Sequence, residues 1–447
     1  MSSPIVDRVR AAGIVGAGGA GFPTHVKLGA TADTVIANGA ECEPLLRCDK
    51  AVLKERTADV LLGLGALAEA VGARRLVLAL KGHYADLVAH VRRVAAELAP
   101  VVAIVPLDNY YPAGDEQVLV HEVTGRVVPE GGIPLNVGVV VDNVITLMQV
   151  AEAVRDGRPV TRRPLTVAGA VPRALTLAPP LGAPMRLAVE LCGGATVPDW
   201  VLLEGGPMMG RLVTDPDEPI TKRTSGLIVL PREHALVQRR QATLEREVRL
   251  ARVVCCQCRM CTDLCPRRNL GHALQPHLAM RALKHEGVVE APPEHVTAAF
   301  LCCLCGACET YACPLGLSPR RVYGSLRAEL AKAGHKNPHT RKDLVPDELQ
   351  QLRRIPLPRL IARLGLTEYV DAPHAVDLRP IAAPRVRLRL GEHTGAPARP
   401  VVAVGQAVRA GDLVAEIPEG KLGARYHASI DGTVVAVDPT EVQIARS

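Results

Sequence analysis

Two short stretches hold most of the residues whose side chains could do chemistry. "VCCQCRMCTDLCPRR" at 254–268 and "LCCLCGACETYACPLG" at 301–316 contain ten of the thirteen cysteines in the 447-residue chain. Each stretch includes a Cys-Cys pair near its start and a later Cys-Pro step. Such crowding indicates thiolates that bind metal in a reducing compartment rather than a framework of disulfides.

The first stretch has the C-x2-C-x2-C-x3-C-P spacing by which bacterial ferredoxins hold a [4Fe-4S] cluster. Three thiolates lie on one tight loop, and the fourth, followed by proline, opens the next segment. In two-cluster ferredoxins that fourth cysteine ligates the other cluster, so two such motifs predict a crossed pair of clusters. The predicted ligands are Cys255, Cys258, Cys261 and Cys265.

The second stretch departs from this spacing by one residue before its last cysteine, which a bulge could absorb. Its predicted ligands are Cys302, Cys305, Cys308 and Cys313. The second cysteine of each pair, Cys256 or Cys303, is expected to be spare, because starting from it leaves a single residue before the next cysteine. The crossed arrangement assigns Cys313 to the cluster of the first loop and Cys265 to that of the second.

Zinc is the alternative for these cysteines, since paired C-x2-C elements also build tetrahedral zinc sites. Zinc requires neither a third cysteine at the same step nor the Cys-Pro exit, and both copies have both. The segment between the motifs has helical apolar spacing that includes Leu283. Its histidines, His272, His277 and His285, are expected at the surface or in packing rather than as ligands.

A glycine-rich stretch near the start, "GIVGAGGAGFPTHVKL" at 13–28, satisfies the G-x-G-x-x-G pattern at Gly16, Gly18 and Gly21. Its context argues against a Rossmann fingerprint, because an amphipathic helix rather than a strand precedes it and Pro23 sits where a helix would begin. Glycines still let backbone amides approach a phosphate or a flat ring, and Lys27 favours anions. A purely structural turn remains the alternative.

Several motifs in order carry a resemblance to a known family. They are "GAGGAGFPTHVKL", "NGAECEP", residues 111–147 ("YPAGDEQVLVHEVTGRVVPEGGIPLNVGVVVDNVITL"), "EGGPMMG" at 204–210 and the two cysteine motifs. Together they resemble the flavin-binding subunit of respiratory complex I and, more closely, the RnfC component of the Rnf electron-transport complex. The resemblance covers nearly the whole chain.

By that resemblance the N-terminal domain binds FMN with a nicotinamide nucleotide stacked on it. Matching positions fall in the glycine-rich loop, in "NGAECEP" and in the strip at 111–147. They are Gly16, Gly18, Gly19, Gly21, Phe22, Lys27, Asn38, Glu41, Glu43, Gly114, Asp115, Glu116, Asn143 and Thr146. The implied cofactors are therefore FMN, NADH and two [4Fe-4S] clusters.

The chain is expected to be multidomain, of mixed α/β and α+β class. Apolar strand-like runs at 34–38, 75–82, 101–107 and 137–144 alternate with helical segments. The sequence that follows is rich in Pro and Gly. A charged helix is expected at 233–254. The predicted parts are an FMN/NAD-binding α/β domain (1–160), a ubiquitin-like SLBB β-grasp domain (161–232), a helical dicluster domain (233–335), a connector (336–380) and an Rnf-type barrel-sandwich domain (381–447).

The last part resembles the sandwich that carries lipoyl or biotinyl groups. It lacks the usual modifiable lysine tripeptide, and Lys421 has the wrong context, so a structural or docking role is expected. The RnfC component carries such a sandwich before its flavin domain, whereas here it comes last. Its position at the end resembles the cobalamin reductases of propanediol-utilisation microcompartments.

Composition and sequence patterns argue against a membrane-spanning, a secreted or a nucleic-acid-binding protein. No run reaches the roughly 18 uncharged apolar residues of a membrane helix; the best candidate, from Val60, is broken by Glu69, Arg74 and Arg75. The N-terminus lacks a secretory signal pattern. The net charge of +7 is spread along the chain and aromatic residues are 2%, so no nucleic-acid partner is expected. We expect a cytoplasmic protein, with a microcompartment interior as a narrower option.

A nicotinamide delivers two electrons as hydride and a cubane cluster accepts one, and flavin can connect the two. The leading hypothesis is therefore an NADH-dependent oxidoreductase that sends electrons through FMN and two clusters to a corrinoid or a corrinoid-handling protein. One alternative is an Rnf-like peripheral component of a membrane ferredoxin:NAD oxidoreductase. Another is a non-catalytic cluster-bearing protein that binds a microcompartment shell protein. No catalytic acid, base or nucleophile is needed for the electron transfer.

Overall fold

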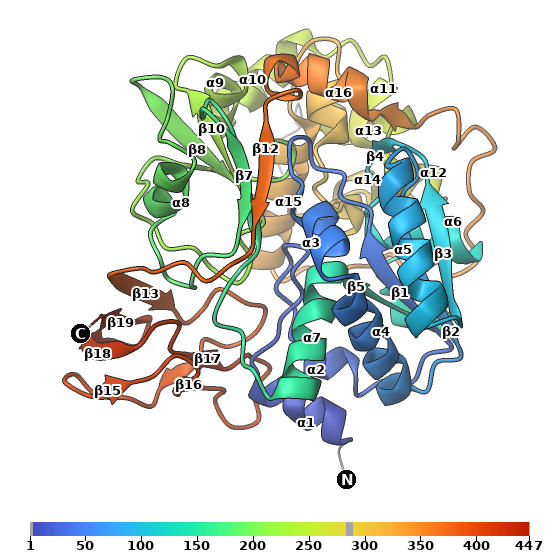
Figure 1. Cartoon of the computed structure of the whole chain (residues 1–447). Helices are drawn as coiled ribbons and strands as arrows, with labels where there is room; N and C mark the ends of the chain where they lie inside the picture. Colours follow the sequence, from blue (N-terminus) through green and yellow to red (C-terminus); the bar gives the residue numbers. More distant parts are fainter. Residues whose placement is uncertain (1–2, 283–288, 447) are drawn as a thin grey trace.

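A computed structural model describes residues 3–282 and 289–446 (Figure 1). An α/β part, a mixed β-sheet part, a helical cysteine-bearing part and a C-terminal part of two small sheets follow one another along the chain. Leu283 and His285, expected between the cysteine motifs, lie outside the described residues.

A four-stranded parallel sheet forms the centre of the α/β part. Its order is β3-β2-β1-β5, with β1 (Thr34–Gly39), β2 (Arg75–Lys81), β3 (Val102–Leu107) and β5 (Val139–Asn143). These strands are the four apolar runs predicted from the sequence, and parallel strands read as continuous apolar runs when helices cover both faces. Since β2 and β3 extend the sheet on one side of β1 and β5 lies on the other, the topology switches between β1 and β5.

Helices surround this sheet. They are α1 (Pro4–Ala11), α2 (Thr24–Lys27), α3 (Cys48–Glu55), α4 (Thr57–Val71), α5 (Ala85–Leu98), α6 (Glu116–Thr124) and α7 (Val144–Asp156), with a short η1 (Pro134–Val137) and the strand β4 (Tyr110–Tyr111). α4 and α7 cross closely at Gly63, where an added Cβ would lie 1.9 Å from the carbonyl oxygen of Leu147. Glycine at this position therefore sets the distance between the two helices.

A six-stranded mixed sheet follows, in the order β12-β7-β6-β10-β8-β9. Its elements are β6 (Leu165–Gly169), β7 (Ala174–Leu177), α8 (Met185–Leu191), β8 (Trp200–Glu204), β9 (Arg211–Val213), β10 (Gly226–Pro231) and β12 (His374–Asp377). β6 and β7 form an antiparallel hairpin, and β10 pairs in parallel with β6. β12 comes from the segment predicted as a connector, and Figure 1 shows it (orange) beside β7 (green).

The cysteine-bearing part is built from short helices. They are α9 (Ala235–Gln241), α10 (Leu244–Val254), α11 (Met260–Asp263), α12 (Pro266–Asn269), α13 (Pro276–Ala282), α14 (Glu294–Thr297), η2 (Ala298–Leu301), η3 (Cys308–Ala312) and α15 (Pro319–Lys332). The prediction of one charged helix at 233–254 was wrong, because α9 ends at Gln241 and α10 begins at Leu244, with Thr243 as its N-cap. The Thr243 hydroxyl accepts a hydrogen bond from the Arg246 amide at 3.3 Å, as an N-cap does.

The remaining elements lie in the connector and the C-terminal part. The connector holds β11 (Ile355–Pro356), paired with β4, then α16 (Leu357–Leu364) and η4 (Thr367–Tyr369). One C-terminal sheet has the order β13-β19-β18-β15, formed by β13 (Arg385–Arg389), β15 (Ala407–Val408), β18 (Gly432–Val437) and β19 (Glu441–Ala445). The other is β14-β16-β17, formed by β14 (Arg399–Pro400), β16 (Leu413–Glu416) and β17 (Tyr426–His427).

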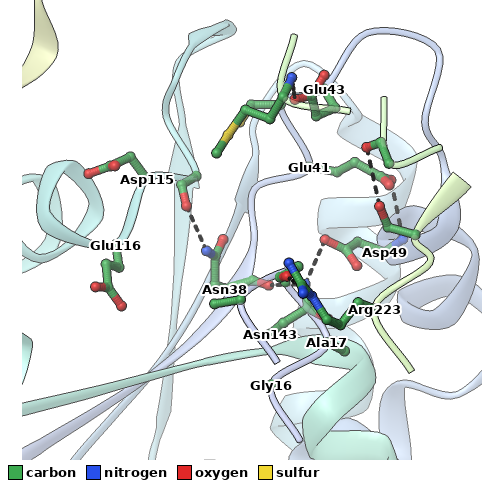
Figure 2. A pocket seen from close by; sticks show the side chains of 18 of the residues that line it. Gly16, Ala17, Asn38, Glu41, Glu43, Asp49, Asp115, Glu116, Asn143 and Arg223 are labelled. Atoms are coloured by element: carbon green, nitrogen blue, oxygen red, sulfur yellow. Dashed lines mark hydrogen bonds between the residues drawn. The ribbon is translucent and has the colours of Figure 1, made fainter. Parts of the chain in front are cut away.

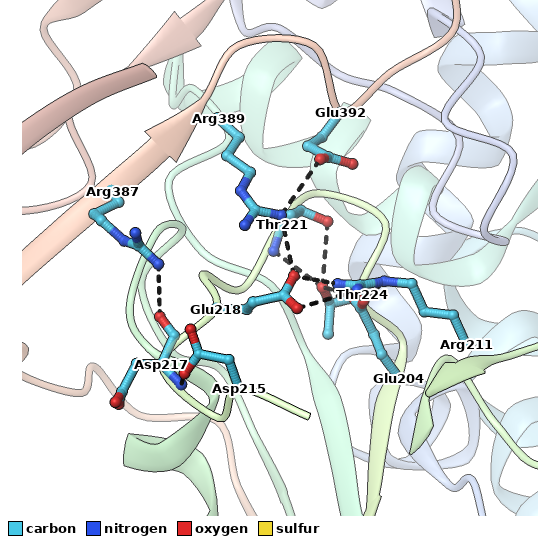
Figure 3. A network of polar contacts seen from close by, with 10 residues as sticks. All are labelled: Glu204, Arg211, Asp215, Asp217, Glu218, Thr221, Thr224, Arg387, Arg389 and Glu392. Atoms are coloured by element: carbon cyan, nitrogen blue, oxygen red, sulfur yellow. Dashed lines mark hydrogen bonds and ion pairs between the residues drawn. The ribbon is translucent and has the colours of Figure 1, made fainter. Parts of the chain in front are cut away.

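Polar contacts attach this C-terminal sandwich to the six-stranded sheet (Figure 3). Glu218 accepts from Arg211 at 2.8 Å and from Arg389 at 3.2 Å, so one carboxylate joins the two parts. The Arg387 guanidinium donates to the Asp217 carbonyl at 2.8 Å. A buried apolar cluster also runs continuously through the α/β part, the six-stranded sheet and the sandwich. Among the described residues no helix is long and apolar enough to cross a membrane.

Buried histidines in the sandwich predict acid sensitivity. Burial lowers the pKa of His393 to about 4 and that of His427 to about 3, with the Lys222 charge as a further cause for both. Between those values and the ordinary 6.5, the unfolded chain binds protons that the folded chain does not. Stability therefore rises with pH across this window and is lost as the pH falls through it.

We expect His427→Gln to lower, by about one, the number of protons that the chain takes up on unfolding in this pH window. The slope of the unfolding free energy against pH, measured by denaturant titration between pH 4.5 and 6.5, should then fall by about 1.4 kcal/mol per pH unit. His90→Gln, at a position on α5 that is only partly buried, is the matched control. An unchanged slope in the His427 variant would contradict the prediction.

Candidate cofactor cavity and cysteine centre

A cavity of about 780 Å³ opens at the carboxyl ends of β1 and β5. Asn38 and Asn143 are register partners at the ends of these two strands and both line it. The crevice outside the carboxyl ends of parallel strands, at the switch in topology, is where open α/β sheets bind ligands. The volume lies within the range of cofactor sites, about 300–1,000 Å³.

Most of the predicted flavin-site residues line this cavity. They are Gly16, Gly18, Gly19, Phe22, Lys27, Asn38, Glu41, Glu43, Gly114, Asp115, Glu116 and Asn143. Figure 2 shows Asp115 and Glu116 on the opposite side of the pocket from Asp49 and Glu41. The structure therefore brings together side chains from the glycine-rich loop, from "NGAECEP" and from residues 111–147.

The two other predicted residues support the glycine-rich loop from behind. Buried Thr146 accepts a hydrogen bond from the Ala17 amide at 2.9 Å. Gly21 has φ +66°, and an added Cβ would lie 2.9 Å from Cδ of Arg223, so only glycine leaves room for that arginine. At Gly19, by contrast, an added Cβ would meet nothing within 4 Å, which shows that the loop is open toward the cavity.

Lys27 is not a free cation. Its Nζ donates to the Val141 carbonyl at 2.9 Å and to Asp142 Oδ1 at 3.1 Å. The second carboxylate oxygen of Asp142 is buried without a partner. The lysine charge is therefore largely balanced within the protein, and less of it is available to an anion than the sequence suggested.

A buried acidic group forms one wall. Glu41 accepts from the Cys48 amide at 3.1 Å and from the Asp49 amide at 3.2 Å, while Asp49 accepts from Asn143 Nδ2 at 2.9 Å. Burial raises the pKa of both carboxyls, and the Asp49 charge raises the pKa of Glu41 further. Each carboxyl is therefore easier to protonate than in water, and the wall carries less negative charge than two free carboxylates would.

Glu43 fixes the loop at 205–210 over the cavity. Its carboxylate accepts from the Met208 and Met209 amides, both at 2.8 Å. Arg240 and Arg320, from the cysteine-bearing part, donate to the Met208 carbonyl at 2.6 and 2.7 Å. Met208 is fully buried, as expected for a packing residue, whereas Met209 is half exposed and lines the cavity.

The remaining wall comes from the cysteine-bearing part. Cys303 and Cys305 line the cavity, and the Tyr111 hydroxyl donates to the Cys305 carbonyl at 2.5 Å. Asp115 caps α6 and forms a buried ion pair with Arg267 at 2.9 Å. Arg267 directly follows the Cys265-Pro266 step, so both cysteine motifs are attached to the cavity.

The two cysteine loops have left-handed backbone at equivalent positions. Gln257 and Arg259 in the first loop have positive φ, as do Leu304 and Gly306 at the equivalent positions of the second. Three of these four residues are not glycine, and left-handed backbone costs such residues about 1–2 kcal/mol each. A turn that is repeated despite this cost indicates that the two loops serve the same purpose.

The cysteines gather in two mixed sets. Cys255, Cys258 and Cys261, and also Cys256, line one small pocket together with Cys313 of the other motif. Burial raises the pKa of Cys261 to about 12, and the Cys313 charge is the next cause. Burial likewise raises the pKa of Cys308, with the charges of Cys302 and Cys265 among the further causes. Each last cysteine thus lies near the loop of the other motif.

The extra residue of the second motif is accommodated in a π-helical turn. η3 covers Cys308–Ala312, and the Cys313 amide donates to the Cys308 carbonyl at 3.1 Å, five residues back. In the first motif the Cys265 amide donates to the Thr262 carbonyl, three residues back. A π-turn takes in more residues than an α- or 3₁₀-turn, which accounts for the longer spacing before Cys313.

Sequence reasoning missed several residues of the cavity. They are Asp49, Arg163, Arg211, Arg223 and Arg267, among others. The arginines come from parts of the chain outside the predicted flavin domain, and nothing in their local sequence marks them. Only Arg267 had an available signal, because it follows the Cys-Pro step that connects the motifs.

Matches to family models agree with this architecture. Residues 9–152 match the Nuo51 FMN-binding domain, residues 254–318 a 4Fe-4S dicluster domain, and residues 376–447 the RnfC barrel sandwich hybrid domain. The fold and the site define an oxidoreductase of the flavin and iron–sulfur electron-transfer class. The predictions of an FMN domain, a dicluster domain and a barrel sandwich are confirmed.

Individual relatives narrow this class. The chain is 44% identical, over 99% of its length and 96% of the relative's, to cobalamin reductase PduS of Salmonella typhimurium. The RnfC-type component of the ion-translocating oxidoreductase complex of Rhodobacter capsulatus is 35% identical over 59% of this chain and 49% of its own. The chain belongs to the PduS family of cobalamin reductases, as the domain order predicted.

A solved structure supports the fold. The crystal structure of an NAD⁺-reducing [NiFe]-hydrogenase in the H₂-reduced state contains a chain that superposes with a TM-score of 0.50 at 22% identity. The match covers 76% of this chain and 64% of the hydrogenase chain. At this identity the likeness concerns the fold alone.

We expect Glu43→Ala to release the loop at 205–210, because the Met208 and Met209 amides lose their acceptor. Hydrogen exchange of the peptide that contains Met208 and Met209 should accelerate about tenfold or more, with Glu43→Gln intermediate because it keeps one acceptor oxygen. Glu190→Ala, at an exposed position on α8, is the control. Equal exchange in Glu43→Ala and the parent chain would show that other contacts hold the loop.

Proposed function

We propose that this chain is an NADH-dependent cobalamin reductase. It takes a hydride from NADH through FMN and passes electrons through two [4Fe-4S] clusters to a corrinoid, reducing cob(III)alamin to cob(II)alamin. One observation carries the proposal: a single cavity is walled both by the predicted flavin-site residues and by Cys303 and Cys305 of a cysteine motif. The site that would accept the hydride is thus in contact with a site for one-electron carriers.

The residues of the cavity fit FMN. The open side of the glycine-rich loop at Gly19 leaves space for a flat ring or a phosphate. Asp142 Oδ2 and Arg163 Nη1 are buried polar atoms without partners, and both residues line the same cavity. Bound FMN would take two electrons as hydride and release them one at a time. The chain's own part is to hold the ring and to exclude water from it.

NADH belongs to the same proposal. Exposed Arg223 reaches over the glycine-rich loop, where its Nε donates to the Gly19 carbonyl at 2.8 Å. With half-exposed Met209 it lines the cavity from loops that connect strands of the six-stranded sheet. The guanidinium of Arg223 thus gives this edge of the cavity a polar group, which supports a nicotinamide beside the flavin.

The ligand sets of the clusters are proposed to be crossed. Cys255, Cys258, Cys261 and Cys313 would hold one cluster, and Cys302, Cys305, Cys308 and Cys265 the other. The shared pocket of the first set and the closeness of Cys265 to the second loop support this assignment. Because Cys305 lines the flavin cavity, the second set would accept electrons first. The first set, with exposed Cys258, would pass them out of the protein.

The spacing of the thiols favours clusters over zinc. Around one zinc ion the sulfurs lie about 3.8 Å apart, given a Zn–S bond of about 2.3 Å. In residues 3–282 and 289–446, the one group of potential ligands with all atoms within 4.8 Å of one another is Glu41, Cys48 and Asp49. The cysteine motifs form no such tight group among these residues, and a four-iron cluster needs a wider set.

The domain limits given above, including the β-grasp domain at 161–232, are part of the proposal. A hairpin of β6 and β7, the helix α8 and a strand β10 parallel to β6 support a β-grasp arrangement. The corrinoid acceptor rests on the full-length likeness to PduS. A cytoplasmic location inside a microcompartment, with a shell protein as partner, rests on the same likeness.

The crossed ligation predicts which substitutions damage the same cluster. Cys313→Ser should remove the EPR signal that Cys258→Ser removes, and Cys265→Ser the signal that Cys305→Ser removes. Each should lower the iron content of the purified protein by about four of eight atoms, because one cubane is lost. If Cys313→Ser instead behaved like Cys305→Ser, the ligation would not be crossed.

The spare cysteines are the matched controls. Cys256→Ser and Cys303→Ser should keep the full iron content, because neither position fits the spacing of a ligand. If one of these variants lost a cluster, the substituted cysteine would be a ligand in place of the neighbouring cysteine assigned above.

Anaerobic titration with NADH tests the enzyme class. About two NADH per chain should reduce the flavin and both clusters fully, since FMN takes two electrons and each cluster takes one. Added cob(III)alamin should then reoxidise them, two cobalamins for each NADH consumed. If NADH reduced the flavin and the clusters but cobalamin did not reoxidise them, the chain would still be an NADH-dependent oxidoreductase. A corrinoid would then be excluded as its electron acceptor. Clusters that NADH cannot reduce would favour a docking role instead.

A further inference from the structure

Arg163 is a buried cation that the flavin and cluster assignments leave without a role. It lies just before β6 and is 1% exposed, one of the largest fully buried side chains among the described residues. Its Nε donates to the Thr224 carbonyl at 2.8 Å, and its Nη2 donates to the Ala17 carbonyl at 2.6 Å. The guanidinium therefore joins the glycine-rich loop to the six-stranded sheet.

The third guanidinium nitrogen of Arg163 is unsatisfied. Nη1 is buried and has no hydrogen-bond partner, while Arg163 itself lines the cavity. Buried charged donors without partners are rare in native proteins because they lose their hydration without replacement. With the other two nitrogens held by protein carbonyls, the free one is available to a ligand in the cavity.

The surroundings of Arg163 limit what that ligand can be. Asp49, Glu41 and Cys48 are near enough for their charges to affect the arginine, and Asp49 is held by Asn143. The negative charge that these carboxyls keep, although reduced by their raised pKa values, disfavours a phosphate dianion at this place. A planar edge that offers carbonyl acceptors beside an N–H donor matches a guanidinium next to carboxyls. The pyrimidine edge of a flavin ring has this arrangement.

We propose that Arg163 is a flavin-binding residue, whose Nη1 donates to a carbonyl on the pyrimidine edge of FMN and whose charge stabilises the negative charge that the ring gains on reduction. The inference rests on the proposed function only in that the cavity takes FMN. Charge placed near this part of the ring is one way in which a protein sets flavin electronics.

The test uses the full-length, cluster-loaded protein after removal of flavin. In Arg163→Met, the Kd for FMN should rise about 10- to 100-fold, the range for one charge-assisted hydrogen bond. Riboflavin, which lacks the phosphate, should lose affinity by the same factor. The reduction potential of bound FMN, measured by spectroelectrochemistry, should become more negative. Arg163→Lys keeps the charge and should recover most of the potential.

The control is Arg162→Gln, because Arg162 is the adjacent arginine, is half buried and is not among the cavity-lining residues. Weaker binding of FMN with unchanged binding of riboflavin would assign Arg163 to the phosphate and overturn the inference. An unchanged Kd for FMN together with an unchanged reduction potential would also overturn the inference. This holds whether the variant shows a higher KM for NADH or only a lower melting temperature. If the parent chain binds no FMN, the proposed function fails as well.

Discussion

The buried ion pair between Arg267 and Asp115 is the contact on which the rest of the site depends. Both side chains are almost fully covered, and removing one partner of such a pair leaves an unpaired charge that costs about 3–5 kcal/mol. Asp115 also caps α6 at the cavity, while Arg267 lies two residues after Cys265. One interaction therefore sets the distance between the cofactor cavity and the cysteine centre, which electron transfer between them requires.

Other contacts across the same boundary act through backbone atoms. Glu43 accepts from the amides of the loop at 205–210, and Arg240 and Arg320 donate to carbonyls of that loop from the cysteine-bearing part. Three parts of the chain thus meet at one short loop. Backbone contacts of this kind depend on conformation rather than on the identity of Met208 and Met209, whose side chains only pack or line the cavity.

The sequence predicted the features that depend on spacing, namely the cysteine motifs, the strands of the parallel sheet and the order of the parts. It did not predict features that depend on the way distant segments meet. Arg163 carries no local signal, and Lys27 was expected to be available to anions because its partner Asp142 lies more than a hundred residues away. The split of the charged helix at Thr243 is local, and the capping role of that threonine was open to prediction. The extra residue before Cys313, for which the spacing predicted a bulge, is accommodated in a π-helical turn.

The sandwich illustrates how a part can serve the site from any position along the chain. Thr394 donates from its amide to the Gly21 carbonyl at 2.9 Å and from its hydroxyl to the Ala20 carbonyl at 3.0 Å. Buried Lys222 donates to the carbonyls of Gly13 and Arg425, both at 2.6 Å, and burial lowers its pKa to about 7. The sandwich therefore packs directly on the glycine-rich loop. Since this contact requires a surface and not a sequence neighbour, placing the sandwich last is compatible with a structural role at the cofactor cavity.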